Sequence, residues 1–151
     1  MSEGEKYFWV LGDWVTVRIS SAQTGGDYSL VEAWSPPGGG PPPHIHHREH
    51  EMFHVLEGEL TVTVGGVKTR LLPGQSAHAP KGVPHAFQNT GTSFARFLIA
   101  AIPGGLDRFL QEIGTPVAGV KTGARPVSAA DIDLLNSVAP RYGIEMLPPS
   151  R

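Results

Sequence analysis

The sequence contains no cysteine, which excludes disulfides, thiolate metal ligands and a cysteine nucleophile. It also lacks an apolar segment long enough to span a bilayer, so we expect no membrane insertion. The formal net charge is -2, and without a basic excess we expect no binding to nucleic acid or anionic membranes. Residues 1–6 lack the basic and then apolar regions of a signal peptide, so we expect a cytoplasmic protein.

What is present indicates an all-β protein. The 151 residues suffice for one domain with one core. Glycine (19) and proline (14) are frequent, and they are spread between short apolar runs instead of forming one low-complexity tract. This pattern is typical of many short strands joined by turns, as in a sandwich or barrel.

The order of these apolar runs predicts a closed or double-sheet jelly roll followed by helices. Predicted strands cover 14–19, 28–34, 52–56, 60–64, 67–72, 76–79, 85–89 and 94–102, with a proline- and glycine-rich loop at 35–43. Gly65-Gly66 fits a two-residue hairpin turn, where positive φ is needed. Helical spacing predicts a helix ending before Gly114 and a second one from the N-cap Ser128 to Pro140. We therefore expect a barrel domain at 1–114, then a linker and a helical extension at 115–151.

The histidines carry the functional signal, because five of the seven lie between positions 44 and 54. On a strand, His44 and His46 share a face about 7 Å apart, so that their rings can converge on one ion. Glu51 has the wrong parity for the same strand. We therefore expect residues 47–50 to turn and Glu51 to begin the next strand, with its carboxylate on the same face.

His85 lies on a separate predicted strand, after the rigid turn at 80–84. With His44, His46 and Glu51 it makes three imidazoles and one carboxylate, which leave one or two positions open on a five- or six-coordinate metal. The alternative is a chance cluster of surface histidines. Glu49 is the rival carboxylate ligand.

The remaining histidines have no assigned role in the predicted site. We expect His47 and His50 to be solvated in the turn, with a supporting or occasional ligand role as the alternative. The parity of His54 points it outward or into an interface. His78 could line a cavity or be an ordinary core or surface histidine.

The spacing of these residues resembles the two cupin motifs. Gly38-x5-His44-x-His46-x4-Glu51-x6-Gly58 matches the first motif, and Gly74-x5-Pro80-x-Gly82-x2-His85-x3-Asn89 matches the second. The motifs, at 38–58 and 74–89, cover about a quarter of the chain, and with the segment between them about a third. The resemblance implies a cupin jelly-roll β-barrel with short C-terminal helices, in which His44, His46, Glu51 and His85 bind a metal.

Within this resemblance, the stretch 41–46 and the tail 142–145 look like bacterial cupins related to quercetin 2,3-dioxygenase. The hypothesis is a dioxygenase that uses one divalent ion (Fe, Mn, Ni, Co or Zn) and O2 on a small enolic, phenolic or flavonol-like substrate, with Glu51 as a proton acceptor. The alternatives are a non-redox isomerase or polyketide-type cyclase, and a binding cupin without turnover. Strand parity gives five candidates for the apolar pocket: Phe53, Val55, Phe87, Phe97 and Ile99.

The oligomeric state is predicted from the N-terminal stretch. The apolar residues 7–11 look like a segment that needs cover, and cupin barrels commonly pair through sheet faces or exchanged N-terminal strands. We therefore predict a homodimer, in which this strand lies on the partner barrel. The alternative is that the segment packs on its own barrel.

Overall fold

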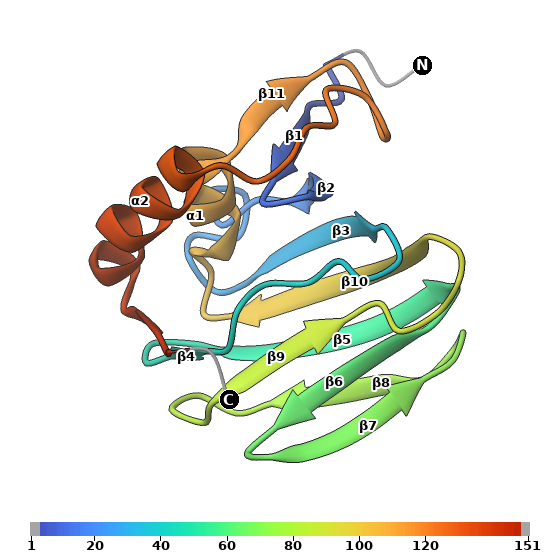
Figure 1. Cartoon of the computed structure of the whole chain (residues 1–151). Coiled ribbons are helices and arrows are strands. Elements are labelled where there is room, and N and C mark those ends of the chain that lie inside the picture. Colours follow the sequence, from blue (N-terminus) through green and yellow to red (C-terminus); the bar gives the residue numbers. More distant parts are fainter. Residues whose placement is uncertain (1–3, 149–151) are drawn as a thin grey trace.

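The computed structural model describes residues 4–148, which form two facing β-sheets and a pair of helices (Figure 1). The strands are β1 (Tyr7–Val10), β2 (Asp13–Ile19), β3 (Ser29–Ser35), β4 (His44–His46), β5 (His50–Glu57), β6 (Leu60–Val64), β7 (Val67–Leu71), β8 (Ser76–Ala79), β9 (His85–Gln88), β10 (Ala95–Ile102), β11 (Thr115–Val117) and β12 (Ile144–Met146). The helices are α1 (Leu106–Ile113), α2 (Ala129–Val138) and the 3-10 turn η1 (Ala139–Tyr142).

The two sheets are antiparallel and are not joined into one closed ladder. One has seven strands in the order β11-β1-β2-β3-β10-β5-β8, and the other has five in the order β12-β4-β9-β6-β7. Strands far apart in sequence are neighbours: β10 lies between β3 and β5, and β9 lies between β4 and β6. This arrangement is the jelly roll of the cupin fold, as the sequence predicts.

The core lies between the sheets because the inward positions of their strands are apolar. In β5 every second residue from Glu51 to Val55 is buried, and in β10 the same holds from Ala95 to Ala101. Phe97 and Val55 are opposite each other in the β5–β10 register, and neither is exposed to solvent. Burial of such side chains contributes roughly 1.5–3 kcal/mol each, so this pair helps to hold β5 and β10 in the core.

The predicted strands all occur, with ends displaced by at most two residues. Strands β6 and β8 have the predicted bounds, and β5 begins earlier, at His50 instead of Met52. Gly65 and Gly66 both have positive φ, at 57° and 84°, so the β6–β7 turn has the conformation that glycine was expected to supply.

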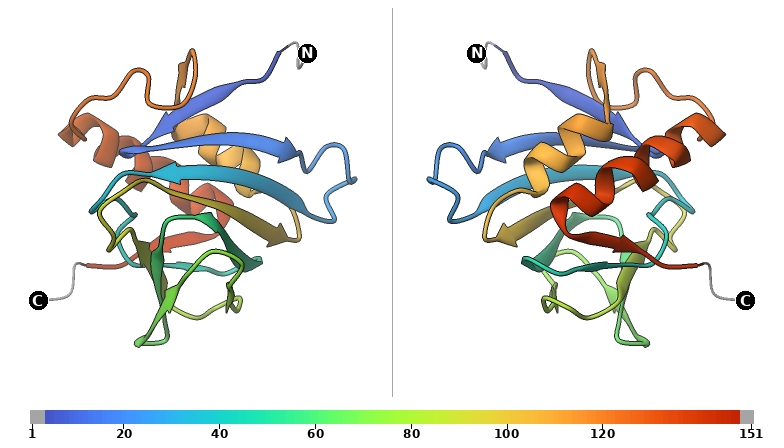
Figure 2. Two further views of the ribbon diagram at one scale, coloured as in Figure 1. Left: turned by 90° about the vertical axis from the view of Figure 1, so that its right-hand side faces the viewer. Right: turned by 90° about the vertical axis from the view of Figure 1, so that its left-hand side faces the viewer.

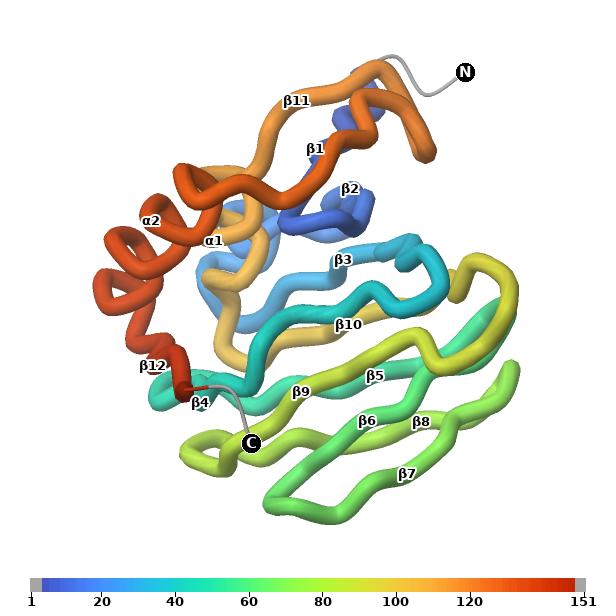
Figure 3. Tube along the Cα trace, viewed as in Figure 1, coloured from blue at the N-terminus to red at the C-terminus, as the bar shows by residue number. Residues whose placement is uncertain are grey.

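Segments at both ends of the chain pair with strands of the two sheets. The apolar segment at residues 7–11 contains strand β1, which pairs with β2 and β11 of its own chain, and Phe8, Trp9 and Val10 are buried there. Exchange with a partner barrel is therefore not needed to cover it. The expected linker begins with strand β11, and the tail forms β12 beside β4, as the trace in Figure 3 shows. Both strands have only three residues, too short to show an alternating pattern.

The helices cover one end of the space between the sheets. Figure 2 shows α1 and α2 side by side, with β12 leading from them back to the smaller sheet. Helix α2 begins as predicted, because Ser128 and Asp131 form a capping box, and it ends at Val138, before Pro140. Among the described residues, no helix combines the length and apolarity needed to cross a membrane.

Candidate metal centre and cavity

Four side chains from three strands converge near the helix-covered end of the fold. They are His44 and His46 of β4, Glu51 of β5 and His85 of β9, and each is buried. One ligand atom from each lies within 4.8 Å of the other three. The structure thus brings together the four residues that the sequence spacing selects.

Strand pairing explains this convergence. His44 is directly opposite His85 in the β4–β9 pair, so their rings lie on the same side, with centroids 4.5 Å apart. His46, two residues along β4, shares that face. Residues 47–49 turn the chain, and Glu51 returns on β5 with an inward side chain, as its parity predicts.

The three imidazoles are held by hydrogen bonds at the ring nitrogen that faces away from the centre. His44 Nδ1 donates to the Pro42 carbonyl at 2.8 Å, and His46 Nδ1 donates to Glu49 Oε1 at 2.5 Å. His85 Nδ1 approaches the Val83 carbonyl at 3.3 Å. Because these partners only accept, Nδ1 carries the hydrogen and the Nε2 lone pair is free for a metal.

The contacts at the centre fit a cation. Glu51 Oε2 lies 2.7 Å from His85 Nε2, and Glu51 Oε1 lies 3.3 Å from His46 Nε2. Carboxylate oxygens accept hydrogen bonds, and so does Nε2 when Nδ1 carries the ring hydrogen, so such approaches need a proton or a metal ion between the atoms. Three imidazoles and one carboxylate are donors that Fe, Mn, Ni, Co and Zn all accept.

Electrostatics keep Glu51 and His44 in the protonation states that a metal requires, whereas the two carboxylates beside His46 favour its protonated form when no metal is bound. Burial lowers the pKa of His44 to about 4, with the neighbouring imidazoles acting in the same direction. Burial raises the pKa of Glu51, but the neighbouring imidazoles of His46 and His85 outweigh it and lower that pKa to about 2. Burial also lowers the pKa of His46, whereas Glu51 and Glu49 raise it, and the net pKa is raised. Glu51 is therefore ionised and His44 neutral near pH 7.

Glu49 is buried next to the centre but on its outer side. Its carboxylate contacts the Nδ1 edge of His46, whereas Glu51 contacts the Nε2 edge of the same ring. Glu49 therefore orients a candidate ligand instead of replacing Glu51. Spacing alone identified Glu49 only as a rival ligand, since the turn at 47–49 has no parity that would give its direction.

The other four histidines do not reach the centre. His47 is exposed and contacts Glu145, and His50 accepts a hydrogen bond from the Lys81 amide. His54 bonds Ser76, and His78 is exposed near the His50 ring. All four lie on the outer surface, so neither the cavity position considered for His78 nor a ligand role for His47 or His50 is seen.

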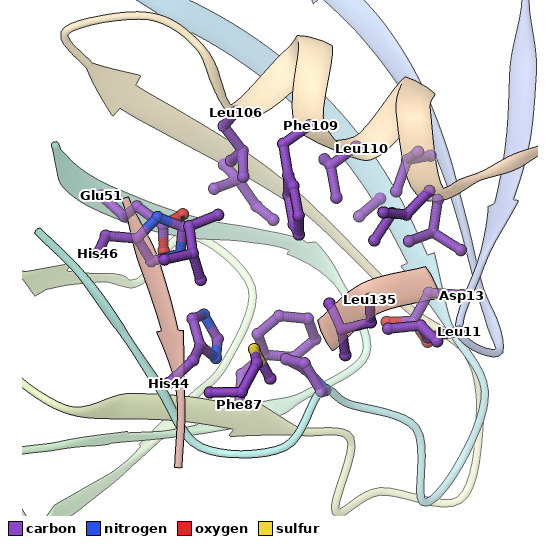
Figure 4. Close-up of a pocket in the computed structure, with 18 of the residues that line it drawn as sticks. Leu11, Asp13, His44, His46, Glu51, Phe87, Leu106, Phe109, Leu110 and Leu135 are labelled. Atoms are coloured by element: carbon purple, nitrogen blue, oxygen red, sulfur yellow. Dashed lines mark ion pairs between the residues drawn. The ribbon is translucent and has the colours of Figure 1, made fainter. Parts of the chain in front are cut away.

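A mainly apolar cavity of about 90 Å³ opens from the four-residue cluster (Figure 4). His44, His46 and Glu51 form part of its wall, and α1 contributes Leu106 and Phe109. Most of the remaining lining comes from strands β1, β2, β3, β5, β9, β10 and β12 and from helix α2. An apolar cavity with a few polar groups is the usual form of a small-molecule site.

Three of the five pocket candidates line this cavity: Phe53, Phe87 and Ile99. Val55 and Phe97 point to the same side of their strands but lie deeper, where both are fully buried in the core and are absent from the lining. Strand parity gives the face of a residue but not its depth along the barrel. The helical lining, including Leu135 of α2, was not anticipated, because contacts between helices and sheets leave no local pattern.

Comparison with known proteins identifies the class. The Cupin domain family matches residues 34–101, the range that holds both motifs and all four candidate ligands. A solved structure of TT1209 from Thermus thermophilus is 32% identical with a TM-score of 0.50, over 52% of this chain and 74% of that one. The chain belongs to the cupin superfamily.

Two curated proteins are similar to parts of the chain. Quercetin 2,3-dioxygenase of Bacillus subtilis is 29% identical over 104 residues, which are 68% of this chain and 31% of that protein. The HTH-type transcriptional regulator PuuR of Escherichia coli is 39% identical over 59 residues, 39% of this chain and 32% of the regulator. The chain spans about a third of the length of each of these two relatives.

Proposed function

We propose that this cupin is a metal-dependent dioxygenase that acts with O2 on a small enolic, phenolic or flavonol-like molecule. The observation that carries the proposal is the placement of three anchored imidazoles and Glu51 at one end of an apolar cavity. The similarity to quercetin 2,3-dioxygenase supports the same substrate class.

The cavity would bind the flat, apolar part of such a molecule. Phe53, Phe87 and Phe109 line it and offer aromatic surface, and Ile99 and Leu106 add aliphatic surface. Burial in this site excludes water and strengthens the interactions of charged groups inside. The enol or phenol oxygen would then face the four-residue cluster, of which His44, His46 and Glu51 form part of the cavity wall.

A bound divalent ion would supply Lewis acidity that lowers the pKa of the substrate oxygen, together with open positions for that oxygen and O2. His44, His46 and His85 would hold the ion through Nε2. Glu51 would complete the set and could accept the substrate proton on a carboxylate oxygen. Because the pKa of Glu51 is lowered to about 2, this transfer depends on a substrate oxygen that has itself become acidic.

The test combines elemental analysis with oxygen uptake. Protein purified without a histidine tag should contain one divalent ion per chain, and it should consume O2 in step with the loss of quercetin or a smaller enol. His85→Ala should lose both the metal and the uptake. His54→Ala, which changes a histidine on the outer surface, should keep both.

A binding protein without turnover is the second candidate, because part of the chain is also similar to part of a transcriptional regulator, PuuR. The two functions differ in outcome. Saturable binding of an enol without O2 consumption, with the compound recovered intact, would contradict the dioxygenase and favour the binding protein. Conversion of the compound without O2 would instead indicate a non-redox isomerase or cyclase.

A further inference from the structure

A second carboxyl group lines the cavity away from the candidate ligands. Asp13 is the first residue of β2, follows the two-residue turn Leu11-Gly12 and is only 7% exposed. Figure 4 shows Asp13 beside Leu11, on the opposite side of the cavity from His46 and Glu51. The cavity therefore has polar groups at two ends and an apolar wall between them.

The carboxyl group of Asp13 is held by one hydrogen bond and has no cationic partner among the described residues. Ser35 Oγ donates to Asp13 Oδ1 at 2.7 Å. Within residues 4–148, no further donor bonds this carboxyl group, and no lysine, arginine or histidine forms an ion pair with it. Oδ2, on a side chain that lines the cavity, thus has no protein partner.

Burial makes Asp13 a far weaker acid than an exposed aspartate, so the protonated form is well populated near neutral pH. Burial raises its pKa to about 7, and the bond from Ser35 offsets only part of this effect. Because Oδ1 already accepts from Ser35, the proton of the neutral form belongs on Oδ2. A protonated carboxyl group of this kind donates a hydrogen bond, as a phenol or an amide does.

The surrounding loop fixes this geometry. A Cβ at Gly39 would lie 2.4 Å from Ser35 Oγ and 2.9 Å from Asp13 Oδ1, so a side chain at position 39 would displace the pair. The side-chain Nδ2 of Asn89 donates to the Ser35 carbonyl, and its backbone N–H donates to the Gly39 carbonyl. Asp13 is therefore placed before any ligand arrives, which lowers the entropic cost of binding to it.

A purely structural role accounts for only one of the two oxygens of the Asp13 carboxyl group. The bond with Ser35 uses one carboxyl oxygen and supports the loop at residue 39. The other oxygen accepts from no protein donor, and it is not among the fully enclosed polar atoms that lack a partner, so it keeps surface that water or a ligand can reach. A ligand that hydrogen-bonds to this oxygen would use a position that the protein leaves open.

We propose that Asp13 is a second anchoring residue, which selects molecules with an oxygen for the metal end of the cavity and a hydroxyl or carbonyl oxygen at the other end. This inference rests on the proposed function, since it takes an enol or phenol oxygen to occupy the metal end. It adds a requirement that the cluster of histidines does not impose, namely a polar group far from the reacting oxygen.

The test uses two flavonols that differ in one distant hydroxyl group. The probes are 3-hydroxyflavone and 3,4′-dihydroxyflavone, which offer the same oxygens to a metal. Calorimetric Kd values are measured with protein loaded with Zn²⁺, which does not support redox turnover. Wild type should bind the dihydroxy probe roughly fivefold more tightly, the worth of one ordinary hydrogen bond.

Three variants separate anchoring from structural support. Asp13→Leu should bring the ratio of the two Kd values to about one, whatever the Kd of 3-hydroxyflavone becomes. Asp13→Asn should keep the preference, because the amide still donates. Ser35→Ala loses the same internal hydrogen bond but keeps the acid, so it should melt at a lower temperature and retain the preference.

The possible results distinguish the role of Asp13 from that of the metal centre. A wild-type ratio near one overturns the role of Asp13 whether or not Asp13→Leu folds, and so does a preference that survives in Asp13→Leu. Neither result bears on the assignment of the four metal-binding residues. If neither probe binds wild type, the proposed function and the anchoring role both fail. Binding of equal strength with and without Zn²⁺, with the preference still dependent on Asp13, would overturn the metal end alone.

Discussion

Glu49 and His46 form a buried pair in which His46 Nδ1 donates to Glu49 Oε1 at 2.5 Å. The opposite edge of the same ring faces Glu51, 3.3 Å away. One imidazole therefore lies between two carboxylates, of which the outer one sets its orientation and the inner one shares its candidate metal. Outer carboxylates of this kind orient metal-binding histidines and increase their basicity.

Loss of the outer carboxylate should weaken metal binding without removing a ligand. We expect Glu49→Ala to lower the affinity for Zn²⁺ by about 10- to 100-fold. Competition with a chromophoric chelator measures this. The matched control is Glu145→Ala, which removes an exposed glutamate from His47 and should leave the affinity unchanged. Equal affinities of wild type and Glu49→Ala would contradict the orienting role.

His85→Ala should lose metal-dependent stabilisation while keeping the fold. A ligand bound only by the native state stabilises it by RT ln(1 + [L]/Kd), about 2.7 kcal/mol at a metal concentration of 100 times Kd. Wild type should therefore melt at a higher temperature with metal than after chelation, and the variant should show a much smaller difference. His78→Ala, at an exposed position on β8 of the other sheet, is the control. A full metal-dependent shift in His85→Ala would remove His85 from the ligand set.

Asp13 should make the metal-free protein less stable as the pH rises. Burial raises its pKa to about 7 in the folded state, against about 3.9 when unfolded, so the folded protein binds more protons between these values. The stabilisation is complete below about pH 4 and is lost by about pH 8, at about 1.4 kcal/mol for each unit of pKa difference. Asp13→Asn should not lose stability in this way, because asparagine does not titrate.

Urea unfolding of both proteins across this pH range isolates the effect, because the other titrating groups are shared. The free energy of unfolding of Asp13→Asn should rise relative to wild type with increasing pH. A difference between the two proteins that stays constant with pH would show that Asp13 is ionised throughout.

The homodimer stays a prediction, although the apolar segment at residues 7–11 no longer requires a partner to cover it. Strand β1 is covered within its own chain, so a dimer would need another surface. Light scattering at micromolar concentration should give twice the chain mass of 16.1 kDa. A mass equal to that of one chain would count against the dimer.

The sequence predicts the parts of this molecule that depend on local pattern. Alternation in β5 and β10, the turn at Gly65-Gly66 and the capping box at Ser128 each involve a few neighbouring residues, and each is seen in the structure. The convergence of His44, His46, Glu51 and His85 followed from strand parity and motif spacing, because both fix direction along a strand.

Features that depend on contacts between distant segments escaped prediction. Asp13 has no motif around it, and its burial follows from the loop at Gly39 closing over Ser35. Leu135 reaches the cavity only because α2 packs against α1. Val55 and Phe97 have the inward parity of lining residues, but their depth in the barrel places them in the core.

The central claim is that His44, His46, Glu51 and His85 bind one divalent ion at the end of the cavity. A crystal structure of the metal-loaded protein, with anomalous data collected at the absorption edge of the metal, tests it most directly. We predict a single anomalous peak with Nε2 of each histidine and a Glu51 oxygen at about 2.0–2.3 Å. A peak held by His47, His50 or Glu49, or no peak at the four residues in fully loaded crystals, would contradict the account.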